Sequence, residues 1–134
     1  MAENNKILVV DGETYTLEFL SYYLSQNGFV VYTSTNGRDA IQQARRILPG
    51  IIMLEVMLPE MDGFETCFEL RKIKELKNTL IALISERNED TAQIIGFEVG
   101  ADDYIKKPVR VNVLIHRLNA LLRRVNKTNR NNLA

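Results

Sequence analysis

Short apolar runs that alternate with stretches of helical periodicity constrain the fold of this chain more than any other feature. Two of the runs, residues 51–54 and 80–84, are apolar without a period of two. Unbroken apolar runs of this length are typical of parallel strands that helices cover on both faces. We therefore predict five strands of a parallel sheet, at residues 7–10, 30–32, 51–54, 80–84 and 104–105.

The segments between these runs repeat apolar residues every three or four positions, which favours amphipathic helices that cover the sheet. Asn36 with Asp39, and Asn88 with the acids after it, resemble helix starts, while Gly28 and Gly100 are expected to end helices. The apolar faces that we predict are Leu17, Leu20 and Leu24; Ala40, Ala44 and Ile47; Phe64, Cys67 and Leu70; Ala92, Ile95 and Val99; and Leu114, Leu118, Leu121 and Val125.

This alternation of strands and helices predicts a doubly wound α/β fold with three layers. Sites in such folds form beyond the carboxyl ends of the strands, at the topological switch point. At the ends of the predicted strands stand Asp11 after the first, Glu55 after the third, Ser85 after the fourth and Lys107 after the fifth. We therefore expect two acids, a hydroxyl and an amine to converge on one site.

Composition limits the classes of partner. The 134 residues are 46% apolar and 25% charged, which is typical of one soluble globular domain. Lysine plus arginine and aspartate plus glutamate both total 17, so the net charge offers no general attraction to nucleic acid or membrane. No apolar run approaches the ~20 residues that span a bilayer, and the single Cys67 cannot form an internal disulfide. We expect a cytoplasmic protein without membrane contact.

Residues 126–134 are polar and lack periodicity, so we predict one domain over residues 1–125 followed by a polar linker or tail. Arg123, Arg124, Lys127 and Arg130 give this end a basic character. Cations are expected near a helix C-terminus because of the helix dipole, so we do not interpret them as a nucleic-acid site.

Three segments carry a resemblance to a known family: KILVVD at 6–11, MLPEMDGF at 57–64 and GADDYIKKP at 100–108. In this order and at these strand ends they resemble CheY-like receiver domains of bacterial two-component response regulators, over about residues 6 to 125. Residues 102–104 and 121–124 are similar to the OmpR/PhoB type, whose members usually continue into a DNA-binding winged helix.

The resemblance implies a flavodoxin-like sheet in the order 2-1-3-4-5 with five helices. It also implies a sensor histidine kinase or an output domain as partner. Contact with DNA is expected only through an effector domain, which these 134 residues do not contain.

The family's site residues can be carried over to five positions. Receivers hold a magnesium ion with acids after the first and third strands, and the hydroxyl and lysine then bind the transferred phosphoryl group. Cations and positioning supply most of the catalysis of such a transfer. The resemblance makes Asp11 the first acid, Ser85 the hydroxyl, Lys107 the lysine and Tyr104 the switch aromatic, while the backbone carbonyl of Met57 completes the metal shell.

Two positions depart from the family. Gly12, between Asp11 and Glu13, stands where the second acid is expected, and Glu55 replaces the phosphoacceptor aspartate. Magnesium requires near-octahedral oxygen geometry, and the oxygens of Glu55 lie about 1.5 Å further out than those of aspartate. We therefore expect weak or no magnesium binding by Asp11, Glu55 and Met57. Since a misplacement of about 1 Å can cost about a hundredfold in rate, we also expect slow phosphoryl transfer to Glu55, and so an atypical receiver that phosphorylation does not switch.

The longer carboxylate of Glu55 has a second implication, because its oxygens would lie where phosphoryl oxygens sit, near Lys107 and Ser85. It could then mimic the phosphorylated state in part, with one negative charge where a phosphoryl group brings about two. Glu55 could instead be a tolerated change at a dead site, or an engineered one, although Gly12 favours natural divergence. By resemblance, the Lys107-Pro108 bond is expected to be cis.

We also predict a two-fold dimer, formed without phosphorylation through the fourth helix, fifth strand and fifth helix, that would control the output. OmpR/PhoB-like receivers tie this face with intersubunit salt bridges, and Asp102, Asp103, Arg117 and Arg124 fall on matching positions. Rim ion pairs contribute little each, so the affinity should be modest and fall with salt.

Two other classes share parts of this pattern. A small phosphatase of the haloacid-dehalogenase type could use Asp11 as nucleophile and Glu13 as acid, but its acidic pair should follow its lysine, whereas residues 102 and 103 precede Lys107. A flavodoxin-like cofactor binder would need a phosphate cradle of glycines and donors where Asp11 stands. We therefore expect a signalling domain and not an enzyme.

Overall fold

The computed structural model describes residues 4–133, and it describes side chains up to residue 125. The expected elements are confirmed: five strands form one parallel sheet in the order β2-β1-β3-β4-β5. The strands are β1 (Lys6–Val10), β2 (Val30–Ser34), β3 (Ile51–Glu55), β4 (Leu80–Ser85) and β5 (Asp103–Lys106); the helices are α1 (Thr14–Gln26), α2 (Gly37–Ile47), α3 (Gly63–Arg71), η1 (Lys74–Leu76), α4 (Asp90–Glu98) and α5 (Val111–Leu133).

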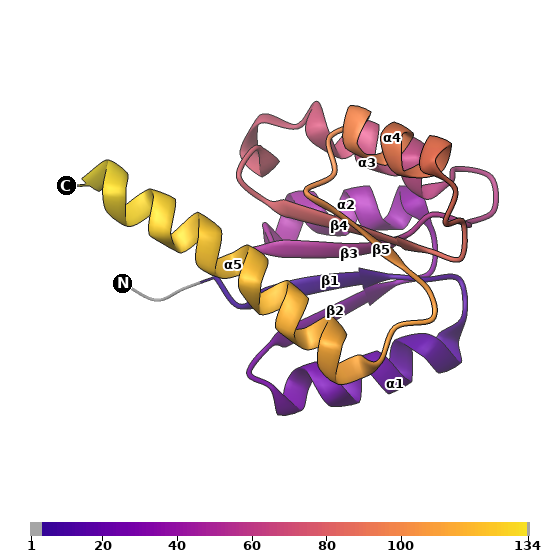
Figure 1. The fold of residues 1–134 in the computed structure, drawn as a ribbon, viewed down its shortest axis with the longest axis horizontal. Coiled ribbons are helices and arrows are strands. Elements are labelled where there is room, and N and C mark those ends of the chain that lie inside the picture. The colour runs from indigo at the N-terminus through magenta and orange to yellow at the C-terminus, as the bar shows by residue number, and fades with distance from the viewer. Residues whose placement is uncertain (1–3, 134) are drawn as a thin grey trace.

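Helices cover both faces of the sheet, as the unbroken apolar runs predicted. α1 and α5 lie on one face, and α2, α3 and α4 lie on the other (Figure 1). Successive side chains of a strand point to opposite faces, so Leu8 and Val10 pack in the core under α2–α4 while Ile7 and Val9 pack in the core under α1 and α5. This architecture buries the three central strands and leaves their ends for polar groups.

Most of the predicted helix boundaries are confirmed. The Asn36 side chain accepts a hydrogen bond from the Asp39 backbone N–H at 2.8 Å and so caps α2. Gly28 and Gly100 follow α1 and α4 with φ of 90° and 106°, a conformation that glycine adopts without a Cβ penalty. The expected start at Asn88 is wrong by one residue, because the N-cap of α4 is Glu89, without a side-chain capping bond.

The end of the chain differs from the prediction. The backbone of α5 stays helical to Leu133, through residues that we expected to form a linker, and its end extends beyond the sheet (Figure 1). Adding a residue to an existing helix costs far less than starting one, so a polar segment without periodicity can continue α5. The predicted domain boundary at residue 125 remains a prediction, and the side chains of Lys127 and Arg130 lie outside the described part.

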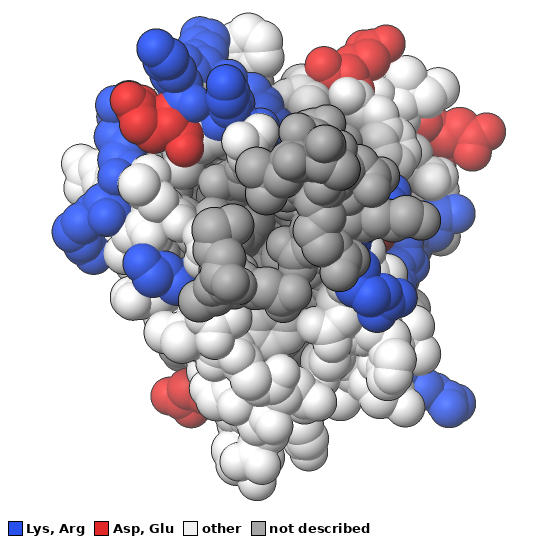
Figure 2. Space-filling view, turned by 90° about the vertical axis from the view of Figure 1, so that its left-hand side faces the viewer, with Lys and Arg blue, Asp and Glu red and all other residues white. Residues whose placement is uncertain are grey.

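The amino ends of the strands form the face shown in Figure 2. Lysine and arginine side chains lie there in separate groups with acidic side chains among them, so the described part of this face shows no continuous basic patch. Over the residues that the structure describes, no helix is both long and apolar enough to cross a membrane.

Candidate functional site

The carboxyl ends of four neighbouring strands bring the predicted site residues together. Asp11 and Glu55 are each 6% exposed, Ser85 is fully buried, and Lys107 is partly exposed. Glu55 and Ser85 are the last residues of β3 and β4, and the parallel register pairs Glu55 with Ile84, so these strand ends lie side by side. The two acids and the amine therefore meet at one site, and Ser85 ends the neighbouring strand.

The central contact of the site is the ion pair between Lys107 and Glu55. The Lys107 Nζ donates a short hydrogen bond to Glu55 Oε2 and lies 3.8 Å from Asp11 Oδ2. The backbone N–H of Met57 donates to the other oxygen, Glu55 Oε1, at 3.3 Å. Glu55 thus has both oxygens engaged by its own chain, and its charge is compensated without a metal ion.

Burial and pairing act in opposite directions on the two partners. Burial raises the pKa of Glu55 above its ordinary value, because the hydrogen bond and charge of Lys107 offset only part of the desolvation. Burial alone would lower the pKa of Lys107, but the hydrogen bond and charge of Glu55, helped by Asp11 and Glu86, raise it. Lys107 is therefore held as an ammonium ion beside the carboxylates of Glu55 and Asp11.

The residues around Asp11 do not fit a magnesium site. Asp11 Oδ1 accepts the backbone N–H of Glu13 at 2.9 Å, and Gly12 offers no side chain. Glu55, the second predicted carboxylate ligand, is bound to Lys107. Among the described residues, no group of three or more His, Cys, Asp or Glu side chains could hold a metal ion. A magnesium ion would have to displace the lysine and still lack one carboxylate.

Tyr104 lies inward, linked to Ser85 through the loop between β4 and α4. The Tyr104 hydroxyl donates to the Arg87 carbonyl at 2.6 Å, and the ring is 4% exposed. The Arg87 backbone N–H donates in turn to Ser85 Oγ at 3.0 Å. We expected Ser85 to contact Glu55, but the Ser85 hydroxyl instead accepts this bond from the Arg87 backbone. Sequence reasoning missed Arg87, because its backbone makes both contacts and any residue has that backbone.

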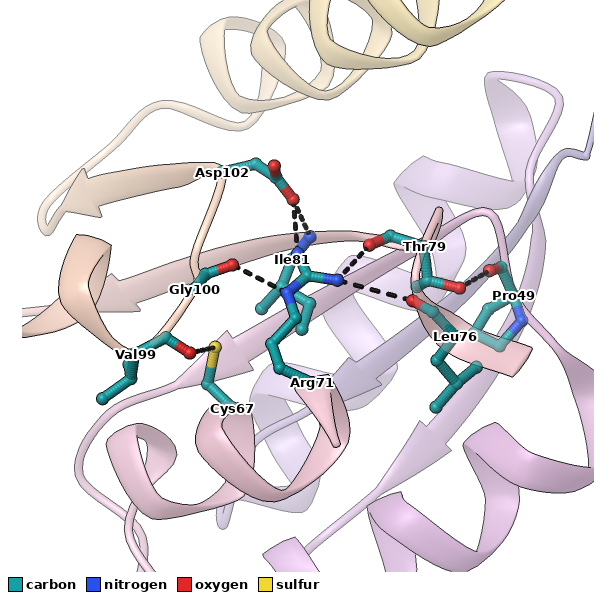
Figure 3. A network of polar contacts seen from close by, with 9 residues as sticks. All are labelled: Pro49, Cys67, Arg71, Leu76, Thr79, Ile81, Val99, Gly100 and Asp102. Carbon is teal, nitrogen blue, oxygen red and sulfur yellow. Dashed lines mark hydrogen bonds and ion pairs between the residues drawn. The ribbon is translucent and has the colours of Figure 1, made fainter. Parts of the chain in front are cut away.

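The residues predicted for a dimer face form ion pairs within one chain. Arg117 contacts both carboxylate oxygens of Asp103, at 3.0 and 3.1 Å for Nη2. Asp102 Oδ2 accepts hydrogen bonds from Arg71 Nη2 at 2.7 Å and from the Ile81 backbone N–H at 2.8 Å (Figure 3). Arg124 is exposed. Intersubunit pairs of Asp102 and Asp103 would therefore have to replace or share bonds that each chain already makes.

The two helices of the predicted dimer face, α4 and α5, also carry exposed apolar side chains. Ile94 and Phe97 of α4 and Val113 of α5 are 57%, 51% and 47% exposed. A shallow hollow of about 300 Å³ on α5 is lined by Asn112, Val113, His116, Arg117 and Ala120. Apolar contacts are therefore available on this face in addition to the charged positions that the sequence indicated.

Comparison with known proteins identifies the family. The sequence model described as the response regulator receiver domain matches residues 7–119. The chain is 39% identical over 121 residues to the alkaline phosphatase synthesis transcriptional regulatory protein PhoP of Bacillus subtilis, covering 90% of this chain and 50% of PhoP. It is 39% identical over 125 residues to the transcriptional regulatory protein SrrA of Staphylococcus aureus, covering 93% of this chain and 51% of SrrA.

Solved structures agree with this assignment. The BeF3-activated DrrB receiver domain superposes with a TM-score of 0.78 at 32% identity, covering 88% of this chain and 97% of that one. The chemotaxis protein CheY4 of Vibrio cholerae gives 0.84 at 28% identity, covering 90% and 99%. The chain spans about half the length of the curated relatives that it matches.

Proposed function

Since the chain belongs to the response regulator receiver domain family, we propose that it is an atypical receiver whose state is set by the Glu55–Lys107 ion pair and not by phosphorylation. The observation that carries this proposal is the hydrogen bond from Lys107 Nζ to Glu55 Oε2, with Asp11 Oδ2 3.8 Å from the same nitrogen. The lysine that would bind an incoming phosphoryl group is already bound to a carboxylate.

Two physical effects oppose phosphorylation of Glu55. Its oxygens already accept hydrogen bonds from Lys107 Nζ and the Met57 N–H, so attack on a phosphodonor would require breaking these bonds in a buried site. The negative charges of the donor would also need cations, and Gly12 removes one of the carboxylates that would hold a magnesium ion there. We therefore propose that this chain binds magnesium weakly or not at all.

The buried place of Tyr104 supports an active-like resting state. Glu55 puts a negative charge against Lys107, as a phosphoryl group would, although with one charge in place of about two. Tyr104 lies inward through its hydrogen bond to Arg87, which is the position that the family associates with the phosphorylated form. On this proposal the domain signals constitutively, or responds to a partner that breaks the ion pair.

Partners and output follow from the family. Receiver domains work with histidine kinases and output domains, and PhoP and SrrA are by name transcriptional regulatory proteins. We propose that this chain controls an attached or partner output in the cytoplasm by forming a homodimer through α4, β5 and α5, without being an enzyme. The phosphatase alternative is disfavoured, because Asp11 accepts the Glu13 N–H and faces Lys107, and the family match is to receivers.

Intact-mass spectrometry after incubation with acetyl phosphate and magnesium tests the proposal. We expect no adduct of about 80 Da, the mass that one phosphoryl group adds. A receiver in which Gly12→Asp and Glu55→Asp restore the family's acids serves as the positive control in the same chain. A stoichiometric, hydroxylamine-labile adduct on the unaltered protein would contradict the proposal.

A further inference from the structure

Gly96 occupies an unusual place in the last turn of α4, two residues before the end of the helix. Glycine is the least favourable residue for a helix interior after proline. Ala92, one turn earlier on the same helix, is fully buried, so alanine is tolerated where α4 merely needs a small residue. A glycine at position 96 therefore calls for a steric reason beyond the need for a small side chain.

The ring of Tyr104 supplies that reason. A Cβ on residue 96 would lie 2.9 Å from Tyr104 Cδ2 and 3.0 Å from Leu83 Cδ1, closer than packed carbon atoms approach. Leu83 is fully buried in β4, within the core under α2–α4. Tyr104 is 4% exposed and its hydroxyl is held by one hydrogen bond, to the Arg87 carbonyl. The tyrosine is therefore the group that would give way.

We propose that Gly96 is a positioning residue whose missing side chain forms the socket for the Tyr104 ring and so keeps the switch aromatic in its inward place. Residue 96 thereby controls the contacts that continue from Tyr104 to Arg87 and Ser85 at the candidate site. The regulatory meaning of this socket rests on the proposed function, but the placing of the ring does not depend on phosphorylation.

The socket can be tested by measuring how accessible the Tyr104 ring is to solvent. A soluble paramagnetic agent broadens NMR signals of exposed protons, and Tyr15, 76% exposed, gives an internal reference for an open ring. In the unaltered protein, we expect Tyr104 to be several-fold less affected than Tyr15. In Gly96→Ala, and more so in Gly96→Val, its relaxation should rise toward the Tyr15 value. Protection of Tyr104 that is unchanged in both variants would overturn the proposal.

Thr91→Ala is the matched control, because Thr91 is exposed on the same helix. It should leave the Tyr104 signals where they are. A Tyr104 ring that Thr91→Ala exposes as much as Gly96→Ala does would show a general loosening of α4 and would overturn the proposal.

Melting temperatures provide a second test that does not require the ring signals. Gly96→Ala should lower the melting temperature of the unaltered protein by more than it does in a Tyr104→Ala background, where the clash with the ring is gone and only the contact with Leu83 remains. An equal change in both backgrounds would contradict the socket. If the unaltered protein is phosphorylated but Gly96→Ala still exposes Tyr104, the proposed function is rejected and the socket stands. If the protein is not phosphorylated and Gly96→Ala leaves Tyr104 unchanged, the socket is rejected and the proposed function stands.

Discussion

Two buried or partly buried ion pairs lie at opposite ends of the same sheet, and they differ in what else their cations bind. At the carboxyl ends, Lys107 pairs with Glu55 and approaches Asp11. At the amino ends, Arg71 pairs with Asp102 at 2.7 Å (Figure 3). The arginine is the more completely engaged of the two cations.

Arg71 ties three segments together through hydrogen bonds to backbone carbonyls. Its Nε donates to Gly100 at 2.8 Å, and its Nη1 donates to Thr79 at 2.7 Å and to Leu76 at 3.4 Å. These bonds join the end of α3 to the segment before β4 and the loop before β5. Because the guanidinium donors point in fixed directions, this cluster holds one arrangement. Lys107 instead carries a compact charge on a flexible chain, next to two carboxylates, so its contacts are less directional.

The largest expected effect is the loss of Arg71. Arg71→Met would leave the Asp102 carboxylate without its cation and three carbonyls without that donor, so we expect the free energy of unfolding to fall by about 3 kcal/mol. Lys72→Met is the control, since the Lys72 side chain is 57% exposed, and it should change stability by less than about 0.5 kcal/mol. Urea unfolding of both variants measures the difference. Equal losses would show that the network in Figure 3 contributes no more than a surface lysine.

A smaller loss is expected at the other end of the sheet. Lys107→Met would leave Glu55 buried without its partner, and we expect a loss of about 1–3 kcal/mol, less than for Arg71 because Arg71 also donates to three backbone carbonyls. Lys106→Met, at the exposed neighbouring residue, is the control. Equal melting temperatures for the two lysine variants would refute the structural role of the Glu55–Lys107 pair.

The pH dependence of this loss identifies its cause. The pKa of Lys107 is raised in the folded state above its ordinary value of 10.5, so its stabilising contribution is fully present below pH 10.5 and is lost as the pH rises through the raised pKa. The stability difference between unaltered protein and Lys107→Met should therefore be constant from pH 7 to 9 and shrink above about pH 10.5. The raised pKa of Glu55 acts in acid, where protonation relieves the cost of burying its charge, so the alkaline range isolates the lysine. Urea unfolding of both proteins across this pH range measures the difference in stability. A difference that stays constant up to pH 12 would contradict the assigned role of the Lys107 charge.

The comparison also separates what sequence predicts from what it does not. The fold and the site at the carboxyl ends could be predicted because apolar runs mark strands, and strand order then places Asp11, Glu55, Ser85 and Lys107 together. The Arg71 network and the role of Arg87 could not, because they rest on backbone carbonyls, which leave no pattern of residue types. The role of Gly96 could not be predicted from the sequence either, since it depends on the Tyr104 ring that packs against it from β5.

Restoring the family's acids at positions 12 and 55 should change metal binding at the carboxyl ends of the strands, the end that carries Lys107. A Cβ on Gly12 would have no neighbour within 4 Å, so an aspartate fits there without displacing packed atoms. We expect the double variant Gly12→Asp and Glu55→Asp to bind magnesium at least tenfold more tightly than the unaltered chain, a gain of about 1.4 kcal/mol. Glu55→Asp alone should recover less. Calorimetric titration with magnesium measures both.

The control for restoration is Lys77→Asp, which adds an exposed acid near the Arg71 network at the far end of the sheet. It should leave magnesium binding unchanged. If the restored protein binds magnesium no better than this control, then Asp11 and Lys107 are not placed as in a working receiver.

The smallest expected effect concerns the dimer, because rim ion pairs each contribute only about 0.2–1 kcal/mol. We predict that the unaltered protein dimerises at tens of micromolar without phosphorylation, more weakly at high salt, and that Arg117→Glu weakens the dimer. Sedimentation of untreated protein measures both effects. A monomer at low salt would reject the predicted interface, and so would a dimer that Arg117→Glu leaves unchanged.

Asp103 and Arg117 already pair within one chain. Arg117→Glu alone therefore does not distinguish a pair within one chain from a pair between two chains, and further variants are needed. In Asp103→Arg, both members of the pair are positive, and in Arg117→Asp both are negative, so each variant alone should repel its own copies. A two-fold interface places residue 103 of one copy against residue 117 of the other, so mixing the two variants should restore association with opposite charges facing each other. If the pair acts only within a chain, mixing cannot restore anything, because each chain keeps its own repulsion. Sedimentation of the mixture against each variant alone decides between these pairings, and association that no mixing recovers would place the contact of the dimer elsewhere, with the exposed Ile94 and Phe97 as the next residues to change.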